Sequence, residues 1–222
     1  MVSQAESSSS AGGPTSPAMS SEPRLSDEEI GVARFAAAGL VLVSGILALY
    51  SIFSYWWLIN GTGVDIAFFP GASLRSNGTF STYASAGLGP VGGVYEAILV
   101  LAIVAGILAI VAGVLSFLMT IRHRKPQNMR LAGLALAGVV LEGITVAIAP
   151  AMTPWALNDS GGTPSYCSGW TQGSPCSSFW GTGTYGGVGL TFVGADGWII
   201  MIGALALGVL GLLIWRLGHN PA

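Results

Sequence analysis

The sequence predicts an all-α membrane protein, a bundle of four transmembrane helices whose two outer loops are ordered. Composition is the first observation behind this prediction. Of the 222 residues, 52% are apolar and 8% are charged, whereas an average soluble domain has roughly 25% charged residues. So few charges could not cover the surface of a soluble protein of this size, and we therefore expect lipid to surround most of the chain.

Four apolar runs are the second observation. They occupy residues 33–59, 97–121, 131–152 and 197–215. A helix needs about 20 apolar residues to cross the hydrocarbon core of a bilayer, and each run approaches or exceeds that length. The runs are continuously apolar rather than alternating, which favours helices over the strands of a barrel. We therefore place the transmembrane bundle in residues 29–217.

The first 28 residues have a different composition. They contain a run of four serines and three prolines and show no apolar periodicity, so residues 1–28 are predicted to be a disordered Ser/Pro-rich tail. Ser26 and Glu29 have the spacing of a capping box. The first helix is thus expected to begin just before the membrane.

The positions of the cations predict the orientation. The link between the second and third runs carries Arg122, Arg124, Lys125 and Arg130. By the positive-inside rule this link and both termini are cytoplasmic in a multi-pass protein of the cell membrane. Residues 60–96 and 153–196 are then the outer loops. The four cations should also attract anionic lipid headgroups, at about 1 kcal/mol each. The net charge of −2 excludes a broadly basic surface for nucleic acid.

The second outer loop is predicted to be held by a disulfide. Cys167 and Cys176 both lie in it, and an oxidising compartment would allow them to pair. The bridge would stabilise the loop by about 2.5 to 3 kcal/mol. The same loop is rich in aromatic residues, which suit either a compact cap at the headgroup level or a recognition surface. In the first outer loop, residues 64–69 have strand character, which would permit a small β element joining the two loops.

Three asparagines of the outer loops head N-x-S/T motifs. Asn77 and Asn158 are candidate glycosylation sites. Asn60 also heads such a motif, but it directly follows the predicted first span. We therefore expect it to lie too near the bilayer to be modified.

Small residues recur at four-residue spacing in three of the predicted spans. Lipid tails are as apolar as leucine, so helices in a membrane associate by close packing through such residues. The same spacing also suits a face for self-association with a second copy. The pattern comprises Ala102/Gly106, Ala105/Ala109/Gly113, Gly133/Ala137 and Ala204/Gly208.

Glu142 is the one acidic residue deep within a predicted span. A charge at that depth costs at least roughly 2.5 to 3.5 kcal/mol, so Glu142 should face the bundle interior and find a partner. Ser44 lies at the same nominal depth in the first span and is the natural partner. One interpretation is a polar clamp between helices. The other is a proton or cation relay, with Glu96 and Asp196 as acidic groups at its outer mouth.

Several kinds of site are excluded by the residues available. The cysteines and the two histidines, His123 and His219, fall on opposite sides of the membrane, which argues against a zinc site or a Cys/His nucleophilic pair. The motif at residues 181–186 matches GxGxxG, but it lies in an outer loop with no predicted strand before it. We therefore expect no catalytic residue, no metal and no cofactor.

The arrangement of four spans with inner termini resembles the claudin and tetraspanin classes in outline. Claudin-type proteins have their cysteine pair and a G-L-W motif in the first outer loop, whereas both cysteines here lie in the second. The tetraspanin C-C-G motif does not occur in the sequence. The sequence is therefore assigned to no family.

Two functions remain as expectations. The first is an integral membrane protein without enzymatic activity. It would act as an interaction or accessory subunit through its outer loops and small-residue helix faces, with membrane lipids and another membrane protein or a second copy as partners. The alternative is a small oligomeric transporter or channel that uses Glu142.

Overall fold

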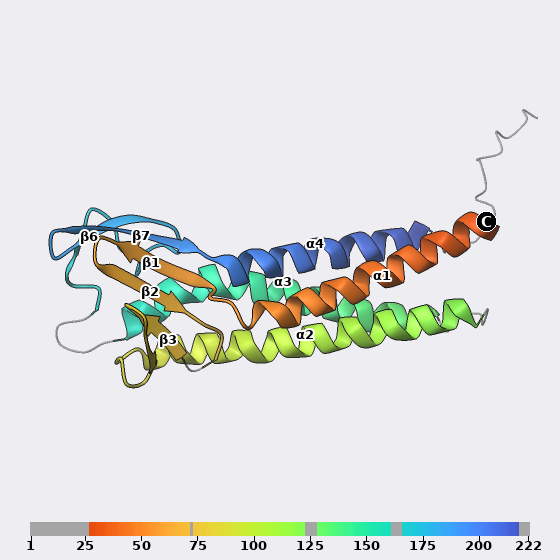
Figure 1. Cartoon of the computed structure of the whole chain (residues 1–222), viewed down its shortest axis with the longest axis horizontal. Coiled ribbons are helices and arrows are strands. Elements are labelled where there is room, and N and C mark those ends of the chain that lie inside the picture. The colour runs from red at the N-terminus through yellow and green to blue at the C-terminus, as the bar shows by residue number, and fades with distance from the viewer. Residues whose placement is uncertain (1–26, 72, 123–127, 161–165, 218–222) are drawn as a thin grey trace, which may run out of the picture.

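The computed structural model describes residues 27–71, 73–122, 128–160 and 166–217, so nearly all of the predicted tail lies outside it. Within these ranges four helices are long and apolar enough to cross a membrane. Figure 1 shows them side by side along the long axis of the molecule. They are α1 (Asp27–Ser51), α2 (Gly89–Ile121), α3 (Asn128–Asp159) and α4 (Asp196–Leu217).

The helices pack as a four-membered ring. Both α1 and α3 pack against α2 and α4, and α1 and α3 face each other across the bundle. Glycine permits the closest approach: a Cβ on Gly45 of α1 would lie 2.7 Å from the carbonyl oxygen of Gly106 on α2. Most of the small residues noted in the sequence are therefore used inside the bundle, as expected for packing in lipid. Gly133 and Ala137 are the exception, because both are exposed on α3.

At one end of the bundle α2 and α3 extend past α1 and α4. A Cβ on Gly106 of α2 would contact Leu49, which is only two residues from the end of α1. Because the two helices are antiparallel, residues 89–102 of α2 lie beyond that end. The last turns of α3 extend in the same way, and Figure 1 shows both helices reaching alongside the strands.

A seven-stranded antiparallel sheet covers these extensions, so the fold is not purely all-α. The β element expected to join the two loops is present, but it is much larger than predicted. Both long loops, residues 60–96 and 153–196 in the prediction, contribute strands, in the order β4-β3-β2-β1-β7-β6-β5. The first loop supplies β1 (Trp57–Gly61), β2 (Val64–Phe68), β3 (Ser73–Ser76) and β4 (Thr79–Thr82). The second loop supplies β5 (Trp170–Thr171), β6 (Gly181–Tyr185) and β7 (Val188–Gly194).

The first apolar run ends differently from the prediction. The expected span covered residues 33–59, but α1 ends at Ser51 and Trp57–Gly61 is the central strand β1. Trp57 and Ile59 are fully buried. They are apolar because they face the core beneath the sheet, and not because they contact lipid.

The two faces of the sheet differ in what covers them. The inner face carries Trp57 and Phe68 and packs on the extensions of α2 and α3. There the Phe68 ring lies 6.0 Å from that of Tyr95 on α2, and Leu157 of α3 joins the same core. The outer face carries the alternate residues, among them Asn60. The inner face therefore fixes the sheet to the bundle.

We expect Gly45→Ala to lower the free energy of unfolding in detergent by about 1 to 3 kcal/mol, as overpacking does in a tight interface. The new methyl group would meet backbone atoms of Gly106 and Ile110, which cannot rotate away. Gly39→Ala is the matched control, because a Cβ at Gly39 of the same helix meets nothing within 4 Å. Thermal denaturation of both variants measures the difference. Equal midpoints would contradict the packing described for α1 and α2.

Candidate functional site

The structure brings Glu142 and Ser44 together across the bundle. The Ser44 hydroxyl donates to both carboxyl oxygens of Glu142, at 2.8 Å to Oε1 and 3.0 Å to Oε2. Both residues are fully buried. Since α1 and α3 are diagonal in the ring, this contact joins the two helices that otherwise scarcely touch.

A glycine of α4 completes the site formed by Ser44 and Glu142. A Cβ on Gly208 of α4 would lie 2.9 Å from the Ser44 hydroxyl oxygen and 3.2 Å from Oε2 of Glu142. The same Cβ would come within 2.7 Å of Val139, so no larger residue fits. Three helices therefore meet at the carboxyl group. The small-residue spacing of Ala204 and Gly208 was visible in the sequence, but its relation to Glu142 was not.

Three other buried hydroxyls of the bundle bond to their own helices, whereas those of Thr153 on α3 and Tyr95 on α2 do not. Ser51 donates to the carbonyl of Ala48. In the same way Ser116 donates to Ala112 O and Thr145 to Leu141 O, both at 2.6 Å. These hydrogen bonds occupy the hydroxyls within single helices. In the described part of the chain they do not form a series of groups leading from Glu142 to either end.

The two acidic residues expected at the outer mouth lie apart from Glu142. Glu96 is exposed on the extension of α2, and Asp196 is exposed at the first residue of α4. Asp196 is linked instead to Tyr55, whose pKa is raised above its ordinary value chiefly by the hydrogen bond to that carboxylate. The carboxyl groups of Glu142, Glu96 and Asp196, which the relay interpretation expected to follow one another along a path, are therefore separate in the structure.

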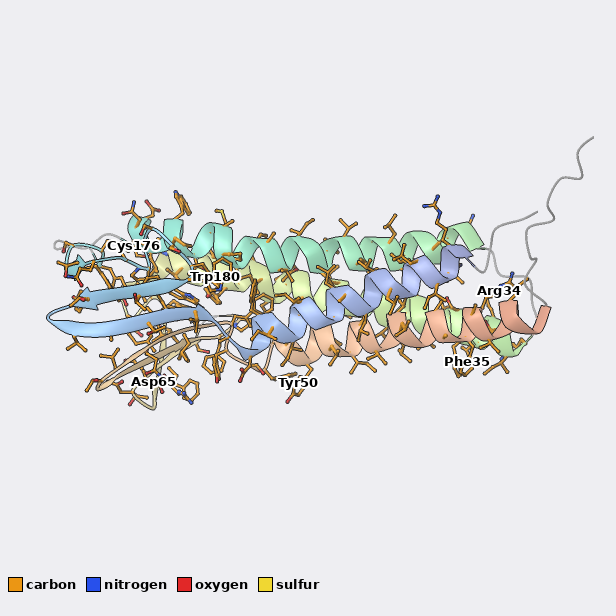
Figure 2. The ribbon with its side chains drawn as sticks, turned by 90° about the horizontal axis from the view of Figure 1, so that it is seen from above. Arg34, Phe35, Tyr50, Asp65, Cys176 and Trp180 are labelled. Carbon is orange, nitrogen blue, oxygen red and sulfur yellow. A yellow bond between two sulfur atoms is a disulfide. The ribbon has the colours of Figure 1, made fainter. Side chains whose placement is uncertain are left out.

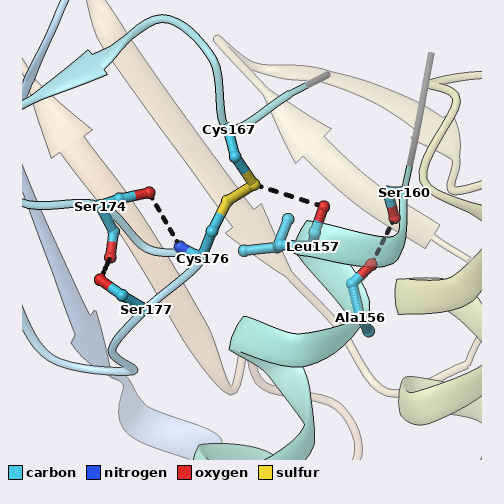
Figure 3. Close-up of a disulfide and its surroundings, with 7 residues drawn as sticks. All are labelled: Ala156, Leu157, Ser160, Cys167, Ser174, Cys176 and Ser177. Carbon is cyan, nitrogen blue, oxygen red and sulfur yellow. Dashed lines mark hydrogen bonds between the residues drawn. A yellow bond between two sulfur atoms is a disulfide. The ribbon is translucent and has the colours of Figure 1, made fainter.

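A disulfide closes the loop between α3 and α4. Figure 3 shows the bridge between Cys167 and Cys176 lying over the end of α3. The Cys167 sulfur lies 3.6 Å from the carbonyl oxygen of Leu157. The Cys176 amide donates to the Ser174 hydroxyl at 3.1 Å. The loop is thus packed on the helix as well as covalently closed.

Some aromatic side chains of the segment 153–196 are buried and others are exposed. Phe179 is buried and stacks on Trp57, with ring centroids 5.6 Å apart. The Trp57 indole donates to the Phe179 carbonyl at 2.7 Å. Three other rings stay open to the surroundings, with Trp155 55%, Trp180 47% and Tyr185 45% exposed. The buried Phe179 suits the interpretation as a compact cap, and the exposed rings suit the interpretation as a recognition surface.

The remaining predicted residues lie on the surface. Asn77 occupies a tight turn between β3 and β4, and Asn158 is exposed near the end of α3. Arg122 and Arg130 are exposed at the opposite end of the bundle, whereas Arg124 and Lys125 lie outside the described residues. The ion pair between Arg75 and Asp65, with Nη2 and Oδ2 3.2 Å apart, was not foreseen because the two residues lie on different strands.

Four apolar helices of this length are compatible with a multi-pass membrane protein, and the sheet at one end distinguishes the fold from a plain helical bundle. Among the described residues there is no group of three or more His, Cys, Asp or Glu side chains placed to hold a metal ion. Comparison of the chain with protein families, curated proteins and solved structures gives no match.

We expect Ser44→Ala to lower the free energy of unfolding in detergent by about 1 kcal/mol, within the range measured for hydrogen bonds between membrane helices. The substitution would leave a buried carboxyl group without its partner. Ser51→Ala is the matched control on the same helix, because its buried hydroxyl bonds only to its own backbone. Thermal denaturation compares the two. If Ser51→Ala costs as much as Ser44→Ala, the contact does not clamp the bundle.

Proposed function

We propose that this protein is an integral membrane protein without enzymatic activity that acts as an interaction or accessory subunit. In this proposal the sheet lies outside the cell, and both termini and the link between α2 and α3 lie in the cytoplasm. The observation that carries the proposal is the exposure of Trp155, Trp180 and Tyr185 on an ordered, disulfide-closed structure.

Exposed aromatic side chains on an ordered structure suit protein recognition. Trp and Tyr are the residue types most often found at the centres of protein interfaces, because they bury a large area with few rotatable bonds. Trp180 is held in place by Phe179, at 4.8 Å, and by Trp198, at 5.4 Å between ring centroids. A partner would therefore meet a side chain that is already ordered, which lowers the entropic cost of binding.

The distribution of charge supports the proposed orientation. Arg34, Arg122, Arg130 and Arg216 all lie at the end of the bundle away from the sheet. The described cation at the sheet end, Arg75, is paired with Asp65. Cations at one end favour that end as the cytoplasmic one, where they would also meet anionic lipid headgroups.

We expect a second membrane protein to copurify with the chain in mild detergent, and the double variant Trp155→Ala/Trp180→Ala to lose most of it. Interface tryptophans of this kind cost about 2 kcal/mol or more when truncated, which is roughly a thirtyfold loss of affinity. Phe80→Ala is the matched control, since Phe80 is 64% exposed but belongs to β4 in the first loop. Quantitative mass spectrometry of the purified complex measures the partner. A lone, monodisperse protein would contradict the proposal.

The second candidate is the transporter or channel, and the fully buried Glu142 is the observation that favours it. We expect Glu142→Gln to keep the fold and the partner, because the Gln side-chain oxygen can still accept the hydrogen bond of Ser44. Proton and cation flux into vesicles containing the protein separates the two candidates. Glu96→Gln, on an exposed residue, is the control. Flux that is abolished by Glu142→Gln and kept by Glu96→Gln would favour the transporter.

A further inference from the structure

We propose that Asn60 is a glycosylation site and that its glycan covers the outer face of the sheet. The inference rests on the proposed orientation, with the sheet outside the cell. Asn60, Gly61 and Thr62 form an N-x-T motif. The apolar run that reaches residue 59 predicts that Asn60 lies too near the bilayer. That objection fails, since α1 ends at Ser51.

Asn60 lies at the end of β1 that points away from the bundle. The start of the strand is fixed beside α4, where the amide of Gly197 donates to the carbonyl of Tyr55 at 2.9 Å. Asn60 is three residues beyond Trp57, which places it about 10 Å further along the strand. The tight turn that follows contains Thr62 and Gly63 and joins β1 to β2. The acceptor residue is thus near the tip of a hairpin.

The Asn60 side chain is free to carry a substituent. It is exposed on the outer face, between the buried Ile59 and the half-buried Gly61. Its side-chain amide makes no hydrogen bond to any other described residue. Thr62, which supplies the hydroxyl of the motif, is also exposed. Both groups that the motif requires are therefore accessible in the folded chain.

The other two motifs are less open. The Asn77 amide is engaged at both atoms: Oδ1 accepts from the Asp65 amide at 2.8 Å, and Nδ2 donates to the Gly63 carbonyl at 3.3 Å. In the motif of Asn158, the hydroxyl of Ser160 is buried and donates to the carbonyl of Ala156 at 2.7 Å. In the Asn60 motif, by contrast, neither the asparagine side chain nor the threonine hydroxyl makes a hydrogen bond to another described residue.

The surface around Asn60 suits a sugar. Its cross-strand neighbours are Asp65 on β2 and Thr191 on β7, and Thr191 in turn faces Thr182 on β6. Residues paired in this way lie on the same face of a sheet. Short hydroxyl and carboxyl groups can exchange hydrogen bonds with sugar hydroxyls. Since β1 is the central strand, a glycan on Asn60 would lie over the middle of this face.

The modification is a group transfer that needs a second reactant and a separate enzyme. The donor is an oligosaccharide joined through phosphate to a membrane lipid, and a membrane oligosaccharyl transferase binds it. The Nδ2–C1 bond forms as the C1–O bond to the lipid phosphate breaks. Nδ2 loses one proton to a base of the transferase, and the lipid phosphate leaves with the bonding electron pair.

The test uses the full chain in membranes of the cell that makes it. Mass spectrometry of the peptide containing residue 60 should find a glycan on wild type and on Thr62→Ser, which keeps the motif. Thr62→Ala and Asn60→Gln should lose it, with a matching increase in gel mobility, whereas Asn77→Gln should keep it. Another glycoprotein from the same membranes serves as the positive control for transfer.

An unmodified Asn60 in wild type, or a glycan that persists in Thr62→Ala, would overturn the proposal. A cysteine introduced by Ala84→Cys, at an exposed position of the sheet end, distinguishes the two ways of failing. If an impermeant thiol reagent labels it on intact cells while Asn60 is bare, the glycosylation site alone is wrong. If the cysteine is reached only after lysis, the proposed orientation fails as well.

Discussion

The pairing of β1 with β7 is the constraint on which the rest of the structure depends. The strand β1 follows α1 closely, and β7 leads directly into α4, so the contact between these helices continues outward as a strand pair. At the junction the amide of Ala195 donates to the carbonyl of Trp56 at 3.0 Å. A Cβ on Gly197 would overlap the Trp56 ring, so this approach requires glycine. Figure 2 shows the helices and the strands as one continuous body.

This continuity determines what the Ser44–Glu142 contact adds to the bundle. The β1–β7 pair and the α1–α4 interface fix two adjacent helices to each other, but they leave the diagonal pair α1 and α3 unconnected. Without a hydrophobic driving force between helices in lipid, register must come from shape and from a few polar contacts. One buried carboxyl group whose two oxygens share the hydroxyl proton of Ser44 can set that register.

The helices could be predicted from the sequence because their signal is local and strong. Length and continuous apolarity identify a span without knowledge of any distant residue. The depth of Glu142 and Ser44 followed from counting along two such spans at about 1.5 Å per residue. The same reasoning placed the end of the first span wrongly, because Trp57 and Ile59 are apolar for a different reason. Composition cannot distinguish a side chain that faces lipid from one that faces the core beneath a sheet.

Most of the sheet could not be predicted, although two of its turns could have been. Asn77 and Gly78 both have positive φ, 47° and 84°, and join β3 to β4 as a two-residue hairpin turn. Gly186 and Gly187 do the same between β6 and β7, with φ of 58° and 83°. Asn-Gly and Gly-Gly are well-known signals for such turns. The pairing of β1 with β7 joins distant segments, so no local pattern in the sequence indicates it.

The end of the molecule that carries the sheet has two separate surfaces, the outer face of the sheet and the exposed side of α3. The inner face packs on α2 and α3, so the exposed side of α3 that carries Trp155 lies on the opposite side from the outer face of the sheet. A glycan on Asn60 would cover only that outer face and would leave the α3 side open. A protein partner bound there would also lie above the exposed pair Gly133 and Ala137, which belongs to the same helix. The exposed side of α3 therefore carries an aromatic side chain at the sheet end and small residues near the other end of the same helix.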